Sequence, residues 1–270
     1  MFNRLVVPVD GSERSWDAVA LASTIGALCD APIEVVQVVA RGDSVDAAQG
    51  ELDREAARHG AGDHTLVAVA GDDVAAVVAD RAARVPGSMV VMSSTGRGRT
   101  AAVLGSVASE VLERMFGPII VLGPEATDPG SFDGDLVVPV DGSEFSEMTL
   151  GLAAAWGIGF GATPWLVEVL TDTTALSADA LESAYVARLA KDLEAESGHD
   201  VEFEVLHGRQ AGREISEFAH GRDARLIMMS THGRTGLARL TMGSTAADVV
   251  HHAPCPVVLS RPPRFADEAE

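Results

Sequence analysis

The sequence predicts an α/β protein of two tandem domains, each with a parallel sheet covered by helices on both faces. Short apolar runs alternate with segments of helical length, which is typical of buried parallel strands joined by crossover helices. The nine residues Leu5 to Glu13 recur unchanged at Leu136 to Glu144. Gly105-Ser106 recurs as Gly243-Ser244 in the same relative order. These observations together indicate a duplicated domain.

Each half is expected to contain five strands. They are expected at Leu5–Val9, Ile33–Val39, Thr65–Val69, Ser88–Met92 and Ile119–Leu122, then at Leu136–Val140, Trp165–Leu170, Val201–Leu206, Leu226–Met229 and Val257–Leu259. The helices between them are expected at Ser15–Leu28, Val45–His59, Val74–Ala83, Ser106–Met115, Ser146–Phe160, Ala178–Gly198, Arg213–His220 and Ser244–His252. Right-handed crossovers then give doubly wound sheets, which bind ligands outside the carboxyl ends of their strands.

The expected domains are residues 1–123 and 136–261. The segment 124–135 is rich in glycine, proline and aspartate and is expected to be a linker. Residues 262–270 begin with two prolines, end in acidic residues and are expected to form a loose tail. We expect the halves to pack as an internal pseudo-dimer, with the last strand of each near the junction.

Composition excludes several classes of partner. The chain of 270 residues carries 40 acidic against 20 basic side chains, a net charge of −20. Binding to nucleic acid or an anionic membrane normally needs clustered basic residues, so neither partner is expected.

No apolar run reaches the length of about 18 residues that suggests a membrane span. The N-terminus lacks a signal-peptide pattern, and two cysteines make no disulfide framework. The sequence therefore predicts a cytoplasmic protein.

A glycine-bearing loop after the strand Leu226–Met229 is the main candidate for a ligand site. It leads to a helix that begins at Ser244, with Thr245 next. Unpaired amides and the helix dipole make a helix N-terminus a favourable anion site. Glycine lets the backbone approach a phosphate closely. We interpret this loop as holding the phosphates of a nucleotide. Asp10 and Asp141 directly follow the first strand of each half. Each aspartate should therefore lie close to the glycine loop of its own half, so that the two can contact one ligand.

The combined motifs resemble the universal stress protein family. The resemblance rests on Val-Pro-Val-Asp-Gly-Ser, on Ser-Thr-His-Gly-Arg-Thr-Gly, on the following Gly-Ser and on Ala-Pro-Cys-Pro-Val-Val. It covers nearly the whole chain as a tandem pair. It implies flavodoxin-like (adenine nucleotide alpha hydrolase-like) domains with five strands. In one branch of the family it also implies ATP, with Mg²⁺, bound through Gly-x2-Gly-x9-Gly-Ser/Thr.

The second half matches that pattern more closely. Ser230 stands at the first glycine position, Gly233 matches the second, nine residues follow, and Gly243-Ser244 completes the motif. The resemblance places Asp141 near the ribose or metal and the Val169 backbone near the adenine. The full second-half set of candidates is Pro139, Val140, Asp141, Val169, Met229, Gly233, Arg234, Gly243, Ser244 and Thr245.

The first half departs further from the pattern. Ser93 replaces the first glycine, and only eight residues separate Gly96 from Gly105. A shorter loop should alter the phosphate cradle, so the second site is preferred. The first-half candidates are Val9, Asp10, Val38, Gly96, Arg97, Gly105 and Ser106. Asp10 and Asp141 are the candidate metal ligands.

The expected function is that of a nucleotide-responsive regulator of a stress response, binding ATP or another adenine nucleotide. AMP and cyclic nucleotides share the same contacts and stay open. Two further hypotheses are a slow ATPase and a scaffold that lost nucleotide binding and acts on an unidentified protein partner. A homodimer of the whole chain is a further alternative. His251 and His252 end a helix, where they favourably meet the dipole, and receive no metal role.

Overall fold

The computed structural model describes residues 2–96, 105–115, 117–171, 176–232 and 242–261, with side chains of 176–183 excepted. Its strands lie close to the expected ranges. They are β1 (Arg4–Val9), β2 (Ile33–Val39), β3 (Thr65–Ala70), β4 (Ser88–Ser93), β5 (Ile119–Leu122), β6 (Asp135–Pro139), β7 (Thr163–Leu170), β8 (Glu202–His207), β9 (Leu226–Ser230) and β10 (Val257–Ser260).

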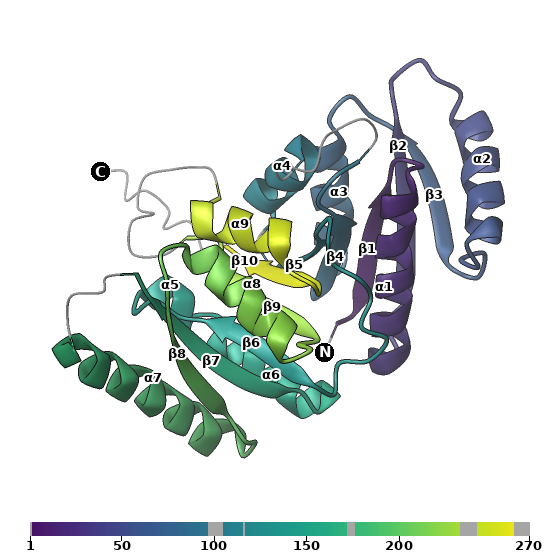
Figure 1. The fold of residues 1–270 in the computed structure, drawn as a ribbon. Coiled ribbons are helices and arrows are strands. Elements are labelled where there is room, and N and C mark those ends of the chain that lie inside the picture. Colours follow the sequence, from purple (N-terminus) through teal and green to yellow (C-terminus); the bar gives the residue numbers. More distant parts are fainter. Residues whose placement is uncertain (1, 97–104, 116, 172–175, 233–241, 262–270) are drawn as a thin grey trace, which may run out of the picture.

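The helices alternate with these strands, as the apolar pattern predicts. They are α1 (Glu13–Cys29), α2 (Val45–Arg58), α3 (Val74–Ala83), α4 (Ser106–Arg114), α5 (Glu144–Glu147), α6 (Leu150–Phe160), α7 (Leu176–Ser197), α8 (Ala211–Gly221) and α9 (Ser244–His252). The fold class is therefore confirmed: α/β, with helices between successive strands of each half (Figure 1).

The two halves share a single sheet of ten strands, in the order β3-β2-β1-β4-β5-β10-β9-β6-β7-β8. Pairing is parallel within each half, whereas β5 and β10 pair antiparallel, with Ile120 opposite Val258. The last strands of the two halves, β5 and β10, thus form the junction, as the sequence analysis predicted. Because the halves run in opposite directions, their carboxyl-terminal strand ends lie at opposite edges of the sheet.

Strand order within each half is 3-2-1-4-5 when the strands are numbered from the start of that half. Flavodoxin itself has the order 2-1-3-4-5, and both orders belong to doubly wound sheets. In this chain the direction of winding reverses between the first and fourth strands. The crevice for a ligand is therefore expected between β1 and β4 and between β6 and β9.

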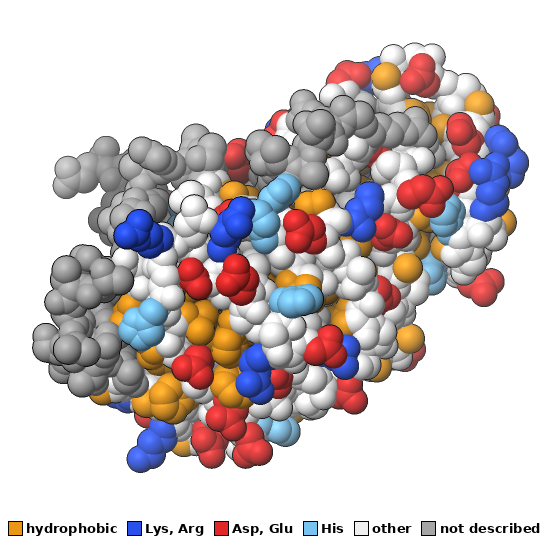
Figure 2. All heavy atoms as spheres, viewed as in Figure 1, with side chains coloured by type: hydrophobic (Ala, Val, Ile, Leu, Met, Phe, Trp, Pro, Cys, Tyr) orange, Lys and Arg blue, Asp and Glu red, His pale blue; other side chains and the backbone are white. Residues whose placement is uncertain are grey.

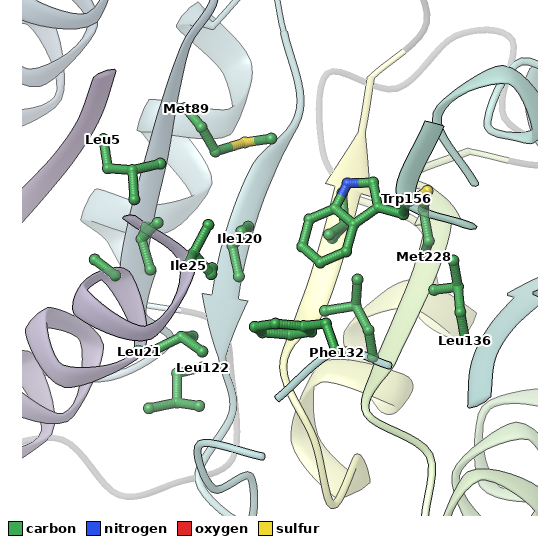
Figure 3. Packing of buried hydrophobic residues seen from close by; sticks show 14 of the residues in the cluster. Leu5, Leu21, Ile25, Met89, Ile120, Leu122, Phe132, Leu136, Trp156 and Met228 are labelled. Atoms are coloured by element: carbon green, nitrogen blue, oxygen red, sulfur yellow. The ribbon is translucent and has the colours of Figure 1, made fainter. Parts of the chain in front are cut away.

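Helices cover both faces of the sheet. One apolar core joins side chains of α1, α2, α6 and α7 to one face, and a second core joins those of α3, α4, α8 and α9 to the other. Each core contains residues of both halves. Figure 3 shows this continuity: Leu21, Ile25 and Ile120 of the first half lie beside Phe132, Trp156 and Met228 of the linker and second half.

The helix expected at Ser146–Phe160 is the one element that sequence reasoning joined wrongly. The structure divides it into α5 and α6, with a turn at Met148 and Thr149. The Thr149 hydroxyl donates to the Ser146 carbonyl at 2.7 Å, which gives that carbonyl a partner outside the regular ladder. Serine and threonine hydroxyls that compete in this way bend or interrupt helices.

The surface carries the acidic excess of the composition. Figure 2 shows Asp and Glu side chains spread over the viewed face, with basic side chains standing among them. Among the residues that the structure describes, no helix combines the length and apolar character required to cross a bilayer.

Candidate functional site

Asp10 and Gly96 meet at the winding reversal of the first half. Asp10 follows β1 and Gly96 follows β4, and these two strands are neighbours. A Cβ atom built on Gly96 would lie 2.3 Å from Oδ2 of Asp10, far inside van der Waals contact. The glycine is therefore required for this approach. The predicted convergence of aspartate and glycine loop is present in the structure.

The Asp10 carboxylate is oriented by the turn that follows it. Its Oδ1 atom accepts from the Ser12 amide at 3.0 Å and from the Ser12 hydroxyl at 2.6 Å. Gly11 between them has φ 79°, a left-handed conformation that suits glycine. Ser12 also caps α1 by accepting from the Ser15 amide. One short turn thus fixes the carboxylate and starts the helix.

The second half repeats this arrangement at Asp141. Its Oδ1 accepts from the Ser143 amide at 3.0 Å and the Ser143 hydroxyl at 2.5 Å, and Gly142 has φ 78°. Ser143 then accepts from the Ser146 amide at the start of α5. Two copies of the same hydrogen-bond pattern place equivalent carboxylates at opposite edges of the sheet.

The two glycine loops close on equivalent bonds despite their different lengths. The Gly105 amide donates to the Ser94 carbonyl at 2.7 Å, and the Gly243 amide donates to the Thr231 carbonyl at 2.9 Å. The one-residue difference therefore leaves the base of each loop unchanged. Most of each loop, including the candidates Gly233, Arg234 and Arg97, lies outside the described residues.

Glycine-capped helices begin where the two loops end. Gly105 precedes α4 and Gly243 precedes α9, and a glycine has no side chain with which to cap the first-turn amides. By contrast, Ser12, Ser44, Asp73 and Ser143 cap α1, α2, α3 and α5 through side-chain oxygens. The hydroxyl-bearing residues Ser106, Ser244 and Thr245 are exposed at these two starts. Both helices therefore present amides and hydroxyls suited to an anion.

The remaining candidates lie in or beside the core. Val9 and Val140 have exposed fractions of 6% and 4%, and Pro139 and Met229 are also buried. Their side chains belong to the packing beneath the strand ends, which leaves only backbone atoms for a ligand. Val38 and Val169 are half-buried near the ends of β2 and β7, opposite Val69 and Leu206. The adenine contact of Val169 stays a prediction.

Sequence reasoning missed the groups that orient the aspartates and close the loops. These are Ser12 with Ser15, Ser143 with Ser146, and the carbonyls of Ser94 and Thr231. A signal for the serines was present, because both copies of the repeat carry two serines three residues apart after Asp-Gly. The carbonyl acceptors carry no such signal, since any residue has one.

Helix α4 of the first half lies beside the glycine loop of the second half. A small cavity of about 50 Å³ separates α4 from the start and end of that loop. Arg261 crosses from the end of β10 and donates from Nη1 to the Glu113 carbonyl at 2.5 Å. The cavity is lined by Ser109, Leu112, Glu113, Thr231, His232, Met242 and Arg261. The second site is therefore adjacent to the junction between the halves.

Fold and site together define a tandem, doubly wound α/β protein with an oriented aspartate and a glycine-capped helix at each winding reversal. The family model described as universal stress protein family matches residues 1–123 and 134–261. The chain belongs to the universal stress protein family, in its tandem form.

Individual relatives agree with this assignment. Universal stress protein Rv2005c of Mycobacterium tuberculosis is 29% identical over 184 residues, covering 64% of this chain and 61% of the relative. The match thus spans less than two thirds of that relative's length. Universal stress protein Rv1996 of the same organism is 27% identical over 307 residues, covering 96% of this chain and 95% of the relative.

A solved structure supports the fold. The crystal structure of a universal stress protein from Archaeoglobus fulgidus superposes with a TM-score of 0.71 at 20% identity, covering 96% of this chain and 98% of that chain. At this identity the similarity concerns the fold alone.

Proposed function

We propose that this protein binds an adenine nucleotide, ATP with Mg²⁺, at the second-half site and acts as a nucleotide-responsive regulator in a stress response. The observation that carries the proposal is the pairing, at each winding reversal, of an oriented aspartate with a glycine-capped helix. In a doubly wound sheet this is the place where ligands bind. Family membership supports the same reading.

The phosphates would lie at the start of α9. The chain is strongly acidic, with a net charge of −20, so an anion needs local compensation for the repulsive field. The first-turn amides and the helix dipole supply it, and the exposed Ser244 and Thr245 hydroxyls add donors. Arg234 is proposed as a phosphate contact from within the loop.

Asp141 would bind the ribose hydroxyls or Mg²⁺. Its carboxylate is held by Ser143 at the strand end, as a ligand for a hard cation should be. A single carboxylate fits Mg²⁺, which is usually bound by one or two carboxylates together with phosphate oxygens and water. When bound, the ion would neutralise phosphate charge; the equivalent carboxylate in the first half is Asp10.

Binding is proposed in preference to rapid turnover. Efficient phosphoryl transfer uses a positioned base and cationic groups on the transferred phosphate, often a lysine. Lys191 is the only lysine of the chain, and it is exposed in the second half of α7, which runs toward the opposite edge of the sheet. The proposed output is therefore a change of conformation or partner that depends on bound nucleotide.

Calorimetric titration of the full chain with Mg-ATP tests this proposal with a matched pair of variants. Cβ atoms built on Gly243 and Gly105 would lie 3.1 Å and 3.0 Å from the carbonyl oxygens of Thr231 and Ser94. Gly243→Ala and Gly105→Ala therefore impose equal local crowding. We expect Gly243→Ala to weaken the tightest binding step at least about tenfold, a loss of about 1.4 kcal/mol. Gly105→Ala should leave that step unchanged.

The scaffold alternative predicts different results. Mg-ATP at 100 times its dissociation constant should stabilise a binding protein by about 2.7 kcal/mol and raise its melting temperature. A melting temperature that stays constant in excess Mg-ATP, with no heat of binding, would overturn the nucleotide proposal. Turnover that Asp141→Ala abolishes would instead favour the ATPase hypothesis.

A further inference from the structure

Glu125, His251 and His252 form a cluster that joins the two halves of the chain. Glu125 follows β5 in the linker, whereas the histidines end α9. Each residue offers one ligand atom, and these atoms all lie within 4.8 Å of one another. Donors bound to one metal ion at about 2.0–2.2 Å lie at most about 4.4 Å apart, so only small side-chain rotations would bring these atoms to ligand spacing. The fold thus brings together three ligand-type side chains from opposite ends of the chain.

The backbone on both sides of Glu125 is fixed against α9 and the turn after it. The Thr127 amide donates to the Pro254 carbonyl at 3.2 Å, and the Ala126 amide donates to the Gly123 carbonyl at 3.2 Å. A Cβ atom built on Gly123 would lie 2.0 Å from the Val250 carbonyl oxygen, so the two segments are in close contact. The backbone position of Glu125 beside the histidines is therefore set by its neighbours, and its side chain is exposed.

Arg14 adds a third restraint on this segment. Its guanidinium donates from Nη2 to the Gly123 carbonyl at 2.5 Å and also to the Pro124 carbonyl. Arg14 lies in α1, so the first-half helix holds the linker from the side opposite α9. Restraint from both sides lowers the entropy that Glu125 would lose on binding a ligand.

His252 is already oriented as a metal-ligating histidine would be. Its Nδ1 atom lies 2.9 Å from the Asp248 carbonyl oxygen and 3.2 Å from Asp248 Oδ1. A hydrogen bond from one ring nitrogen to a carboxylate or carbonyl fixes the tautomer and raises the basicity of the other nitrogen. Nε2 is then the nitrogen for the metal. The His251 ring stands at 90° to the His252 ring, with centroids 4.5 Å apart.

The donor set selects the kind of metal. Two imidazoles and one carboxylate suit Zn²⁺ and similar divalent transition ions, whereas Mg²⁺ and Ca²⁺ prefer oxygen ligands. The nearby Cys255 is not part of the cluster, because its side chain is buried, at 3% exposed, and its sulfur is not among the ligand atoms that lie together. Water would complete the coordination, as in open three-ligand zinc sites.

The cluster is not a duplicated feature of the repeat. With the offset that relates Gly105-Ser106 to Gly243-Ser244, the first-half residues at the two histidine positions are Glu113 and Arg114. Arg114 pairs with Asp73 at 2.7 Å and offers no metal ligand. The histidine pair therefore belongs to one end of the junction only.

We propose that Glu125, His251 and His252 bind one zinc-type divalent ion, which clamps the linker to the last helix of the second half. Because Glu125 lies in the linker and both histidines lie in α9, metal binding would stabilise the docking of the two segments. The proposal does not depend on nucleotide binding, since none of the three residues is a nucleotide candidate.

The proposal is tested by titrating the untagged full chain with ZnCl₂. The protein is first treated with a chelator and freed of nucleotide. We expect one ion bound per chain and a rise in melting temperature. His251→Gln, His252→Gln and Glu125→Gln should each weaken binding at least about tenfold. Asp248→Asn should weaken it about 10- to 100-fold, which is the usual cost of losing an outer-shell partner. His220→Gln, which alters an exposed histidine of α8, is the matched control and should change nothing.

Two results would overturn the clamp. One is the absence of stoichiometric binding to the unmodified chain. The other is loss of binding in the histidine variants with full binding in Glu125→Gln, which would indicate a surface histidine pair that does not involve the linker. Circular dichroism of each variant without metal separates a failure to fold from a failure to bind.

Discussion

Trp156→Ala should lower the free energy of unfolding by about 3–5 kcal/mol, the range found when a buried Trp or Phe is truncated. Trp156 is fully buried in α6. Its ring contacts Phe160, Phe132 and Phe2, with centroids at 4.6 Å, 5.1 Å and 6.1 Å. These partners come from the second half, the linker and the N-terminal segment. Truncation would therefore loosen the packing that joins all three.

Trp156→Phe is the matched control for this effect. The indole Nε1 is buried and has no hydrogen-bond partner among the described residues, so its removal costs no hydrogen bond. We expect a loss of less than about 2 kcal/mol, because most of the aromatic volume is kept. Urea unfolding followed by circular dichroism measures both variants. Equal losses in the two variants, or a loss below 1 kcal/mol for alanine, would contradict this account of the junction.

Glu34→Gln should cost about 3–5 kcal/mol, because it removes the buried negative charge that lies between two partly buried arginines. Glu34 has an exposed fraction of 5%. Its Oε2 accepts from Arg4 at 2.5 Å and its Oε1 accepts from Arg81. Breaking a buried ion pair by removing one partner leaves an uncompensated charge, which is strongly destabilising. Glutamine has nearly the same shape as glutamate, so the loss of unfolding free energy would measure the effect of removing the charge.

Asp72→Asn is the control for an exposed ion pair. Asp72 pairs with Arg41 at 3.2 Å, but the two side chains are 62% and 78% exposed. Such pairs contribute about 0–1 kcal/mol. Urea unfolding curves of the two variants should therefore differ clearly in midpoint. Similar midpoints would show that the Arg4–Glu34–Arg81 cluster is no more important than a surface pair.

The sequence was sufficient for the fold because two independent signals agreed. Buried parallel strands are apolar throughout, so runs such as Ile33–Val39 and Ile119–Leu122 predicted strands with correct ends. The repeat then required the same architecture in both halves. The break between α5 and α6 could not be predicted in this way, since it depends on one threonine hydroxyl and the Ser146 carbonyl.

The candidate site could be predicted only where topology determines it. From the rule that ligands bind at the carboxyl ends of strands, we predicted that Asp10 lies close to the glycine loop of its half. In the structure Asp10 is in contact with Gly96. The burial of Met229 and Val140 could not be read from a motif, because a motif does not distinguish a backbone contact from a side-chain contact. Glu125 and the histidines lie far apart in sequence, and only the pairing of β5 with β10 brings them together.

The most direct test of the central claim is the nucleotide content of protein purified without added ligand. The chain would be denatured and the released small molecules identified and counted by chromatography with mass spectrometry, beside Gly243→Val as a variant blocked at the α9 start. The proposed function predicts about one ATP per unmodified chain and none in the variant. Absence of adenine nucleotide in the unmodified chain, followed by no binding of Mg-ATP in titration, would contradict it.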